Sequence, residues 1–398
     1  MHHQVGTATI ALLLAHASVP AWAAGPIERL SVGPGGNRGG QVFVRDRETH
    51  MNQVVSVGPG GAEGDRTSRL PKISAFGRFV AFESTSANLV PGDLNGKSDV
   101  FVHDRRTGIT QRVSVSSSGV ESDGNSFVPT LSADGRFVAF SSDATTLASG
   151  DSGGPFGSSG VADVVLPDRR TAVTRRLSNG PGGVEGNLNS TSPALSADGR
   201  FVAFQSDATN LVPGDSRGGL FVHERPTGIT LRLNIESNGV AARVQSPVLS
   251  ANGRFVAFSS DAANLVPGDT NGELDVFVHD RETGKTRRVS RGSGGRQSNG
   301  ASFRPALSAD GRWVAFVSEA TNLVPGDTNN MTDVFAYDRR TQTTRRASVG
   351  PGGVQATGVS GSPALSANGR WIGFDSEADN LVPNDNNASD VFVRRLEP

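Results

Sequence analysis

A nine-residue phrase that recurs six times is the strongest constraint on how this chain of 398 residues can fold. It reads SADGRFVAF, with small changes, from Ser74, Ser132, Ser196, Ser250, Ser308 and Ser366. Its Gly-Arg pairs begin at residues 77, 135, 199, 253, 311 and 369, so the spacing stays between 54 and 64 residues. A period of this size predicts an array of similar structural units.

Each unit is expected to contain four short strands, which we name A to D. In the fourth unit they are residues 246–250, 253–260, 275–280 and 285–290. Asp-Gly or Asn-Gly between A and B is a strong signal for a tight hairpin turn. Strand B is almost continuously apolar, so both of its faces must be covered. Four-stranded sheets that stack radially cover both faces, and this predicts an all-β fold, the β-propeller.

The order of the predicted strands indicates how the propeller closes. A proline recurs in strand A at 71, 129, 193, 247, 305 and 363, and a residue without an N–H donor suits an edge strand facing the central channel. The last unit ends after its strand C, whereas residues 27–33 read as a spare strand D. We therefore predict that an N-terminal strand completes the last four-stranded antiparallel blade. Residues 41–57 form an extra hairpin without A or B. Six blades are favoured, and a seven-position ring with one incomplete blade is the alternative.

The units resemble the TolB-type, WD-repeat-like propeller repeat. The resemblance rests on the Ser-Ala-Asp-Gly-Arg turn, the apolar strand after it, and a strand that ends in Asp before a Thr-Gly turn. It implies the propeller fold and an extracytoplasmic location. TolB itself carries an α/β domain ahead of its propeller. Here we expect a propeller over residues 24–398 alone, with the closing strand and extra hairpin in 24–57 and six repeats in 58–398.

The N-terminus reads as a secretory signal. The apolar run VGTATIALLLAHASVPAWA ends at Ala21-Trp22-Ala23, a small-residue pattern typical of a cleavage site. We expect residues 1–23 to be removed and the mature protein to be periplasmic or extracellular. No later run reaches the ~20 apolar residues that a membrane span needs. The 38 basic and 39 acidic residues disfavour nucleic-acid binding, and the absence of Cys excludes disulfides and thiolate metal sites.

The loop between strands B and C repeats the pattern D-x-N-(G/N)-x-x-D, whose oxygen-bearing side chains suit Ca²⁺. The candidate ligands are Asp93, Asn95, Asp99, Asp269, Asn271, Asp275, Asp327, Asn329 and Asp333, with a looser copy at Asp385, Asn387 and Asp390. The pattern is not an EF-hand, because the acid at its twelfth position follows five extended residues at ~3.3 Å each. Two interpretations stay open: a turn capped by Asp and Asn side chains, or a weak Ca²⁺ site of the extracellular type.

Other polar residues predict no catalytic site. His103, His223 and His279 share one repeat position, so they are not expected to converge on a metal. The arginines 78, 136, 200, 254, 312 and 370 are expected to pair with nearby acids. There is no H-E-x-x-H motif, and the only tyrosine that could serve as a sialidase nucleophile is Tyr337.

These patterns lead to two hypotheses of function. The first is a non-enzymatic propeller that binds a protein or a cell-envelope component, with Ca²⁺ as a possible cofactor. Its partner is expected on the face of the B–C and D–A loops, because these loops are long and uneven in length. The alternative is a polysaccharide-active lyase or glycoside hydrolase on a propeller scaffold.

Overall fold

The computed structural model describes residues 9–11, 27–30, 40–148, 150, 161–214, 217–233, 244–383, 385 and 389–396. Contacts divide the chain into two compact units. Unit 1 contains Met1–Leu13 and Gly33–Arg232, and unit 2 contains Leu14–Val32 and Leu233–Pro398. The two units are described separately below.

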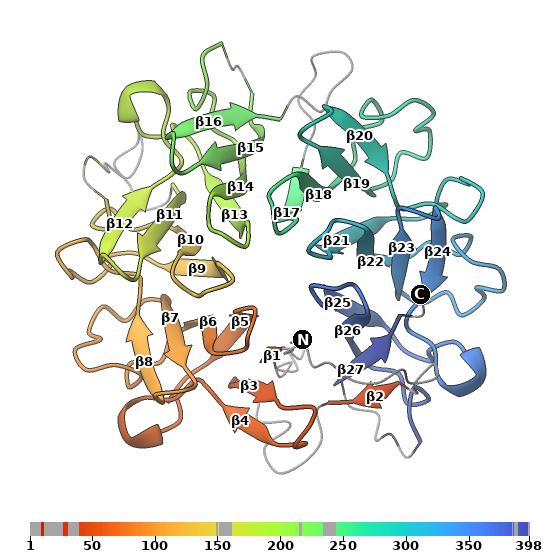
Figure 1. The fold of residues 1–398 in the computed structure, drawn as a ribbon, viewed down its shortest axis with the longest axis horizontal. Coiled ribbons are helices and arrows are strands. Elements are labelled where there is room, and N and C mark those ends of the chain that lie inside the picture. The colour runs from red at the N-terminus through yellow and green to blue at the C-terminus, as the bar shows by residue number, and fades with distance from the viewer. Residues whose placement is uncertain are drawn as a thin grey trace, which may run out of the picture. The chain divides into compact units, whose positions relative to one another are not determined.

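Unit 1 holds three four-stranded antiparallel sheets, called blades 1 to 3 (Figure 1). Blade 1 comprises β5 (Ser68–Ile73), β6 (Phe79–Ser84), β7 (Asp99–Asp104) and β8 (Ile109–Arg112). Blade 2 comprises β9 (Ser126–Leu131), β10 (Val138–Ser142), β11 (Asp163–Asp168) and β12 (Val173–Arg176). Blade 3 comprises β13 (Ser190–Leu195), β14 (Phe201–Ser206), β15 (Gly219–Glu224) and β16 (Ile229–Arg232).

Unit 2 holds blades 4 to 6. Blade 4 comprises β17 (Val244–Leu249), β18 (Phe255–Ser260), β19 (Asp275–Asp280) and β20 (Lys285–Arg288). Blade 5 comprises β21 (Ser302–Leu307), β22 (Trp313–Ser318), β23 (Asp333–Asp338) and β24 (Thr343–Arg346). Blade 6 comprises β25 (Ser360–Leu365), β26 (Trp371–Ser376), β27 (Asp390–Arg395) and β2 (Glu28–Arg29). The fold is therefore an all-β propeller of six four-stranded antiparallel blades, as the sequence predicts.

The N-terminal strand closes blade 6, which confirms the predicted closure. Glu28 and Arg29 of β2 pair antiparallel with Val393 and Phe392 of β27. The N–H of Leu30 then donates to the carbonyl of Val391 at 2.7 Å, and the Leu30 side chain is fully buried. Residues from the two ends of the chain thus share one sheet.

The hydrophobic core lies between neighbouring blades. Strands B and C of five blades carry a stacked pair of phenylalanines, with ring centroids 5.7 to 5.9 Å apart. In unit 1, Phe204 and Phe221 of blade 3 pack with Val164 and Leu166 of blade 2. Because each sheet gives apolar side chains to both of its faces, the nearly continuous apolar pattern of strand B is accounted for.

The extra hairpin forms a three-stranded sheet in unit 1. Strand β3 (Val42–Arg45) pairs antiparallel with β4 (Asn52–Val54), and β1 (Thr9–Ala11) runs parallel to β3. Val42 and Val44 pack on Phe82 and Phe101 of blade 1. The N–H of Ser68 donates to the carbonyl of Gly40 at 2.7 Å, as Ser126 does to Ser98 one blade later. This sheet therefore contacts blade 1 as one blade contacts the next. If residues 1–23 are removed as predicted, β3 and β4 remain in the mature chain.

Strand A carries a backbone feature that the sequence reading missed. The residue before each strand-A proline has a left-handed backbone, with φ between 45° and 56°: Leu70, Val128, Ser192, Ser246, Arg304 and Ser362. The pairing register shifts there, as between Arg69 and Lys72 in blade 1. The proline thus lies in a β-bulge of an edge strand, which needs no ladder donor at that point.

Candidate functional site: the acidic loops and their arginines

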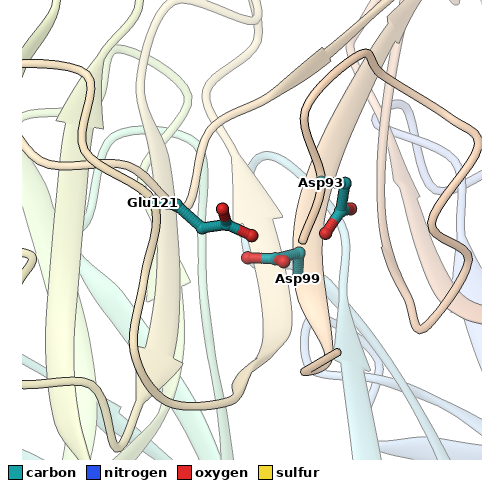
Figure 2. Close-up of side chains that lie close together, drawn as sticks. All are labelled: Asp93, Asp99 and Glu121. Atoms are coloured by element: carbon teal, nitrogen blue, oxygen red, sulfur yellow. The ribbon is translucent and has the colours of Figure 1, made fainter. Parts of the chain in front are cut away.

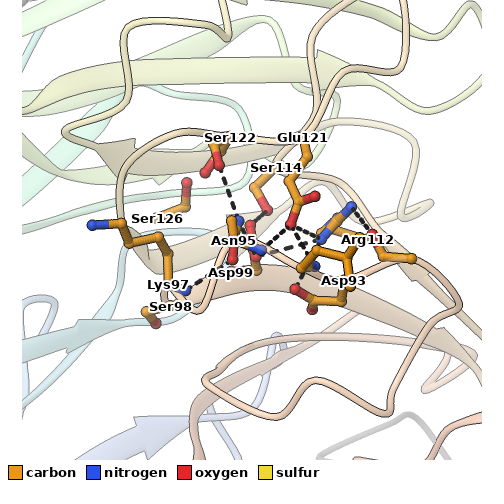
Figure 3. A network of polar contacts seen from close by, with 12 residues as sticks. Asp93, Asn95, Lys97, Ser98, Asp99, Arg112, Ser114, Glu121, Ser122 and Ser126 are labelled. Carbon is orange, nitrogen blue, oxygen red and sulfur yellow. Dashed lines mark hydrogen bonds and ion pairs between the residues drawn. The ribbon is translucent and has the colours of Figure 1, made fainter.

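The acidic B–C loop of blade 1 closes around an arginine. Arg112 is the last residue of β8, and its Nη1 lies 3.1 Å from Asp93 Oδ1 and 3.7 Å from Asp99 Oδ2 (Figure 3). The Arg112 side chain is only 10% exposed. A guanidinium therefore supplies positive charge between two of the residues that the sequence offers as calcium ligands. We call this arrangement the arginine clasp.

Asn95 caps the turn of the loop and also orients Asp99. Its Oδ1 accepts from the N–H of Lys97 at 2.8 Å, which is the turn-capping bond expected of an Asn at this position. Its Nδ2 donates to Asp99 Oδ2 at 2.9 Å. The hydroxyl of Ser114 donates to the other carboxylate oxygen of Asp99. In this arrangement Asn95 presents a donor, rather than an oxygen, to the carboxylate.

A third carboxylate, from the D–A loop, completes the clasp. Glu121 Oε1 accepts from the backbone N–H groups of Leu94 and Asn95 at 2.9 and 2.7 Å. The same oxygen lies 3.0 Å from Arg112 Nη1. Carboxylate oxygens of Asp93, Asp99 and Glu121 lie within 4.8 Å of one another and point to a common centre (Figure 2). The sequence reading did not include Glu121, because it belongs to a different loop from the repeated motif.

The electrostatics of this centre are those of excess negative charge. Burial, together with the nearby charges of Asp99 and Glu121, raises the pKa of Asp93 to about 6, although Arg112 opposes the shift. Burial also raises the pKa of Asp99. For Glu121, burial raises the pKa, but the backbone N–H bonds and Arg112 outweigh it and leave the pKa lowered. Asp93 thus takes up a proton more readily near neutral pH than Glu121 does.

The clasp recurs in unit 2 with fewer acids. In blade 4, Arg288 Nη1 lies 2.9 Å from Asp269 Oδ1 and 3.3 Å from Asp275 Oδ2. Asn271 donates to Asp275 as Asn95 does to Asp99. The position of Glu121 is taken by Gln297, whose Nε2 donates to Asp269. Two carboxylates, rather than three, therefore surround this arginine.

Blades 5 and 6 follow the same plan. In blade 5, Arg346 lies 2.9 Å from Asp327 and 3.1 Å from Asp333, and Asn329 donates to Asp333. In blade 6, the arginine is Arg29 of β2, which lies 2.8 Å from Asp385 and 3.2 Å from Asp390. The predicted ligand Asn387 lies outside the described residues. The closing strand therefore brings both a backbone ladder and the missing arginine to the last blade.

Blade 2 forms a clasp without the loop motif. Arg176 lies 3.4 Å from Asp163 and 3.6 Å from Glu185. These acids stand at the repeat positions of Asp99 and Glu121. A shared signal could have identified the arginines: Asp and Arg are separated by 13 residues in each of the pairs 99/112, 163/176, 275/288 and 333/346.

The loops of the B–C/D–A face also connect neighbouring blades. Asn88, in the B–C loop of blade 1, donates to the carbonyl of Glu63, and its Oδ1 accepts from the N–H of Asp65. Asn322 of blade 5 donates in the same way to Gln297 of blade 4. This face is therefore held by side-chain bonds to the backbone, in spite of its uneven loop lengths.

The opposite end of the blades carries the predicted arginine pairs. Arg78, Arg136, Arg200, Arg254 and Arg312 each bond to the acid that ends strand C of the same blade, at 2.6 to 2.8 Å. Bonding to Arg78 lowers the pKa of Asp104 to about 2. In blade 6 the residue at this position is Arg395 instead of an acid, so the pairing does not extend to Arg370.

Each of the three histidines bonds within its own blade. Nδ1 of His103, His223 and His279 lies 2.9 to 3.0 Å from the hydroxyl of Thr110, Thr230 and Thr286, respectively. Each pair joins strands C and D of one sheet. Each histidine thus bonds a threonine of its own sheet.

Known proteins resemble this chain at low sequence identity. No family model and no curated protein matches the chain. TolB from Acinetobacter baumannii is 15% identical, with a TM-score of 0.44, and the match covers 98% of this chain and 94% of that one. A TolB candidate from Agrobacterium tumefaciens is 14% identical, with a TM-score of 0.45 and coverages of 89% and 97%. The propeller domain of the trilobed protease from Pyrococcus furiosus is 12% identical, with a TM-score of 0.46 and coverages of 77% and 76%.

Proposed function

We propose that this chain is a secreted or periplasmic, non-enzymatic β-propeller that binds a protein or cell-envelope component through its B–C/D–A face. The observation that carries the proposal is a set of exposed apolar side chains at the tips of these loops. In unit 1 they are Leu94, Val120, Val184 and Leu188, and in unit 2 Met331, Val354 and Val359. Exposed apolar side chains on a face that is held rigid favour a docking surface.

The clasp connects two loops of blade 1 that carry such side chains. Leu94 and Val120 are 87% and 53% exposed, and they flank the bonds between Leu94 N–H and Glu121. At the other end of the blades, the described turns carry many ion-paired Asp, Glu and Arg residues, and the exposed large apolar residues beside them are Met51, Phe76, Ile109, Val173 and Ile229. A partner with apolar contacts and a polar rim would fit the loop face better.

The location outside the cytoplasm rests on the predicted signal peptide. Among the residues that the structure describes, no helix has the length and apolar character to cross a membrane. Fractionation of cells that express the full chain tests the location. We expect a periplasmic or secreted protein that begins at Ala24, as N-terminal sequencing would report.

A comparison of the two faces tests the binding role. Leu94→Lys and Val354→Lys place charges on the loop face, and Phe76→Lys places the same charge on an A–B turn that is 86% exposed. We expect the loop-face variants to lose a partner captured from envelope extract by the wild-type protein, and Phe76→Lys to retain it. Equal loss from both faces would refute the assignment.

We propose that calcium, the cofactor considered from the sequence, binds only at blade 1. Three carboxylates surround one arginine there, whereas the clasps of blades 4 and 5 have two. The excess charge supports weak binding, in the ~10⁻⁴–10⁻³ M range of extracellular modules.

Calorimetry with Ca²⁺ on chelator-treated protein tests this proposal. Arg112→Met removes the internal cation, and we expect it to strengthen Ca²⁺ binding at least tenfold. Arg288→Met is the matched control in blade 4 and is expected to change little. Absence of heat in both the wild type and Arg112→Met would remove calcium from the proposal.

A further inference from the structure

A cavity of about 540 Å³ opens at the seam between blades 2 and 3, within unit 1. Its walls include Arg175, Asn179 and Gly182 from blade 2 and its D–A loop, and His223 and Arg225 from blade 3. The volume is in the range of small-molecule sites, ~300–1,000 Å³. None of the residues of the blade 1 arginine clasp lines this cavity.

The equivalent seam between blades 4 and 5 explains why there is space here. In that seam Arg291 stands at the position of Asn179, and Tyr337 at the position of His223. Arg291 Nε donates to the Tyr337 hydroxyl at 3.1 Å, and the guanidinium lies 5.8 Å from the ring centroid. The shorter Asn179 and smaller His223 leave unfilled the volume that this pair occupies.

Other seams are also held by bonds that are not found here. Thr110 and Thr174 donate from strand D to the carbonyls of Val57 and Val115 in the preceding sheet. Ser117 further bonds the backbone of Thr174. At the seam of blades 2 and 3, Pro181 replaces the serine, and no bond joins Thr230 to Asn179 among the described residues. The walls are thus less closely tied at this seam.

The charge of the walls points to the ligand. At other seams the arginine donates to a glutamine of the preceding sheet: Arg105 donates to Gln53, and Arg169 donates to Gln111. At the cavity the corresponding residues are Arg225 and Arg175, so the neutral partner is replaced by a second guanidinium. No Asp or Glu is among the described residues that line it.

The other ionisable groups near the cavity are either paired with an oppositely charged group or uncharged. Arg176 is bound in its clasp by Asp163 and Glu185, and Glu224 bonds Arg200. Burial lowers the pKa of His223 to about 4, so its ring carries no charge at pH 7. Arg225 is held in place by the carbonyl of Gly199 and by the ring of Phe137, 4.0 Å away. Arg175 and the positioned Arg225 are therefore left without a carboxylate among the described residues that line this cavity.

We propose that this seam cavity binds a small organic anion bearing a carboxylate or a phosphate, held between Arg175 and Arg225. Guanidinium groups recognise both anions through paired N–H donors. Leu177, Leu211 and Pro213 supply an apolar surface for the body of the ligand. This small-molecule site adjoins loops of the proposed partner-binding face, since Gly182 and Pro213 line it, but the proposal does not depend on a partner binding there.

Calorimetry at low ionic strength tests the site with glucuronate and inorganic phosphate as probes. Glucose serves as the uncharged match for glucuronate. We expect saturable binding of glucuronate, phosphate or both, and none of glucose. Arg175→Gln should weaken binding at least about tenfold, since a charge-assisted hydrogen bond contributes ~1.5–3 kcal/mol. Arg287→Gln, at the same repeat position in blade 4, should bind like the wild type.

A second variant separates volume from charge. His223→Tyr fills the cavity with the residue found at this position in blade 5, and it should abolish binding without altering the circular dichroism spectrum. Phosphate binding alone, with the same response to both variants, would assign the site to phosphate-bearing ligands. Absence of binding by both anions, or wild-type affinity in both Arg175→Gln and His223→Tyr, would overturn the proposal.

Discussion

At the scale of single residues, the arginine clasp of blade 1 makes stability depend on pH through Asp93. The folded pKa of this carboxyl, about 6, lies above its ordinary value of 3.8. The folded state therefore holds the proton more tightly, and the contribution of Asp93 to stability is lost as pH rises from about 4 through 6. Asp93→Asn cannot lose this proton. We expect its melting temperature, relative to the wild type, to increase between pH 4.5 and pH 8.

The control for this prediction is Asp123→Asn, because the pKa of that exposed acid is lowered rather than raised. For Asp123→Asn the relative melting temperature should not increase over the same interval. If the melting temperatures of Asp93→Asn and the wild type differed by the same amount at both pH values, the charge balance described for the clasp would be contradicted.

At the scale of structural elements, the closing strand β2 is expected to determine the stability of blade 6. A chain that begins at Ser31 lacks the ladder to β27, the buried Leu30 and the arginine between Asp385 and Asp390. We expect faster hydrogen exchange in β26 and β27 than in a chain that begins at Ala24. Unchanged exchange would show that β27 does not need its partner. A single Arg29→Ala variant separates the contribution of the ion pairs from that of the ladder.

The same scale shows what the sequence could and could not predict. The strands, the edge position of strand A and the closure all follow from turn residues and apolar periodicity, which act locally. The bulge at Leu70 and its equivalents was missed, because a proline signals only a lost donor and not a left-handed residue before it. The sequence predicted only part of the clasp. Asp93, Asn95 and Asp99 share one motif, whereas Arg112 and Glu121 reach them through tertiary contacts.

At the scale of the molecule, the core is shared between blades rather than enclosed within them. Phe204 of blade 3 is fully buried against blade 2. Phe204→Ala should destabilise the protein by about 3–5 kcal/mol and increase hydrogen exchange in both blades. Phe76→Ala is the control, because its ring is exposed. Faster exchange confined to blade 3 would contradict a core that crosses the seam.

The pairing of β2 with β27 also has a consequence for biosynthesis. The partner of β2 is β27, which is translated after all the other strands that the structure describes. Glu28 to Leu30 therefore have no sheet to join until β27 has been synthesised, and blade 6 can assemble only then.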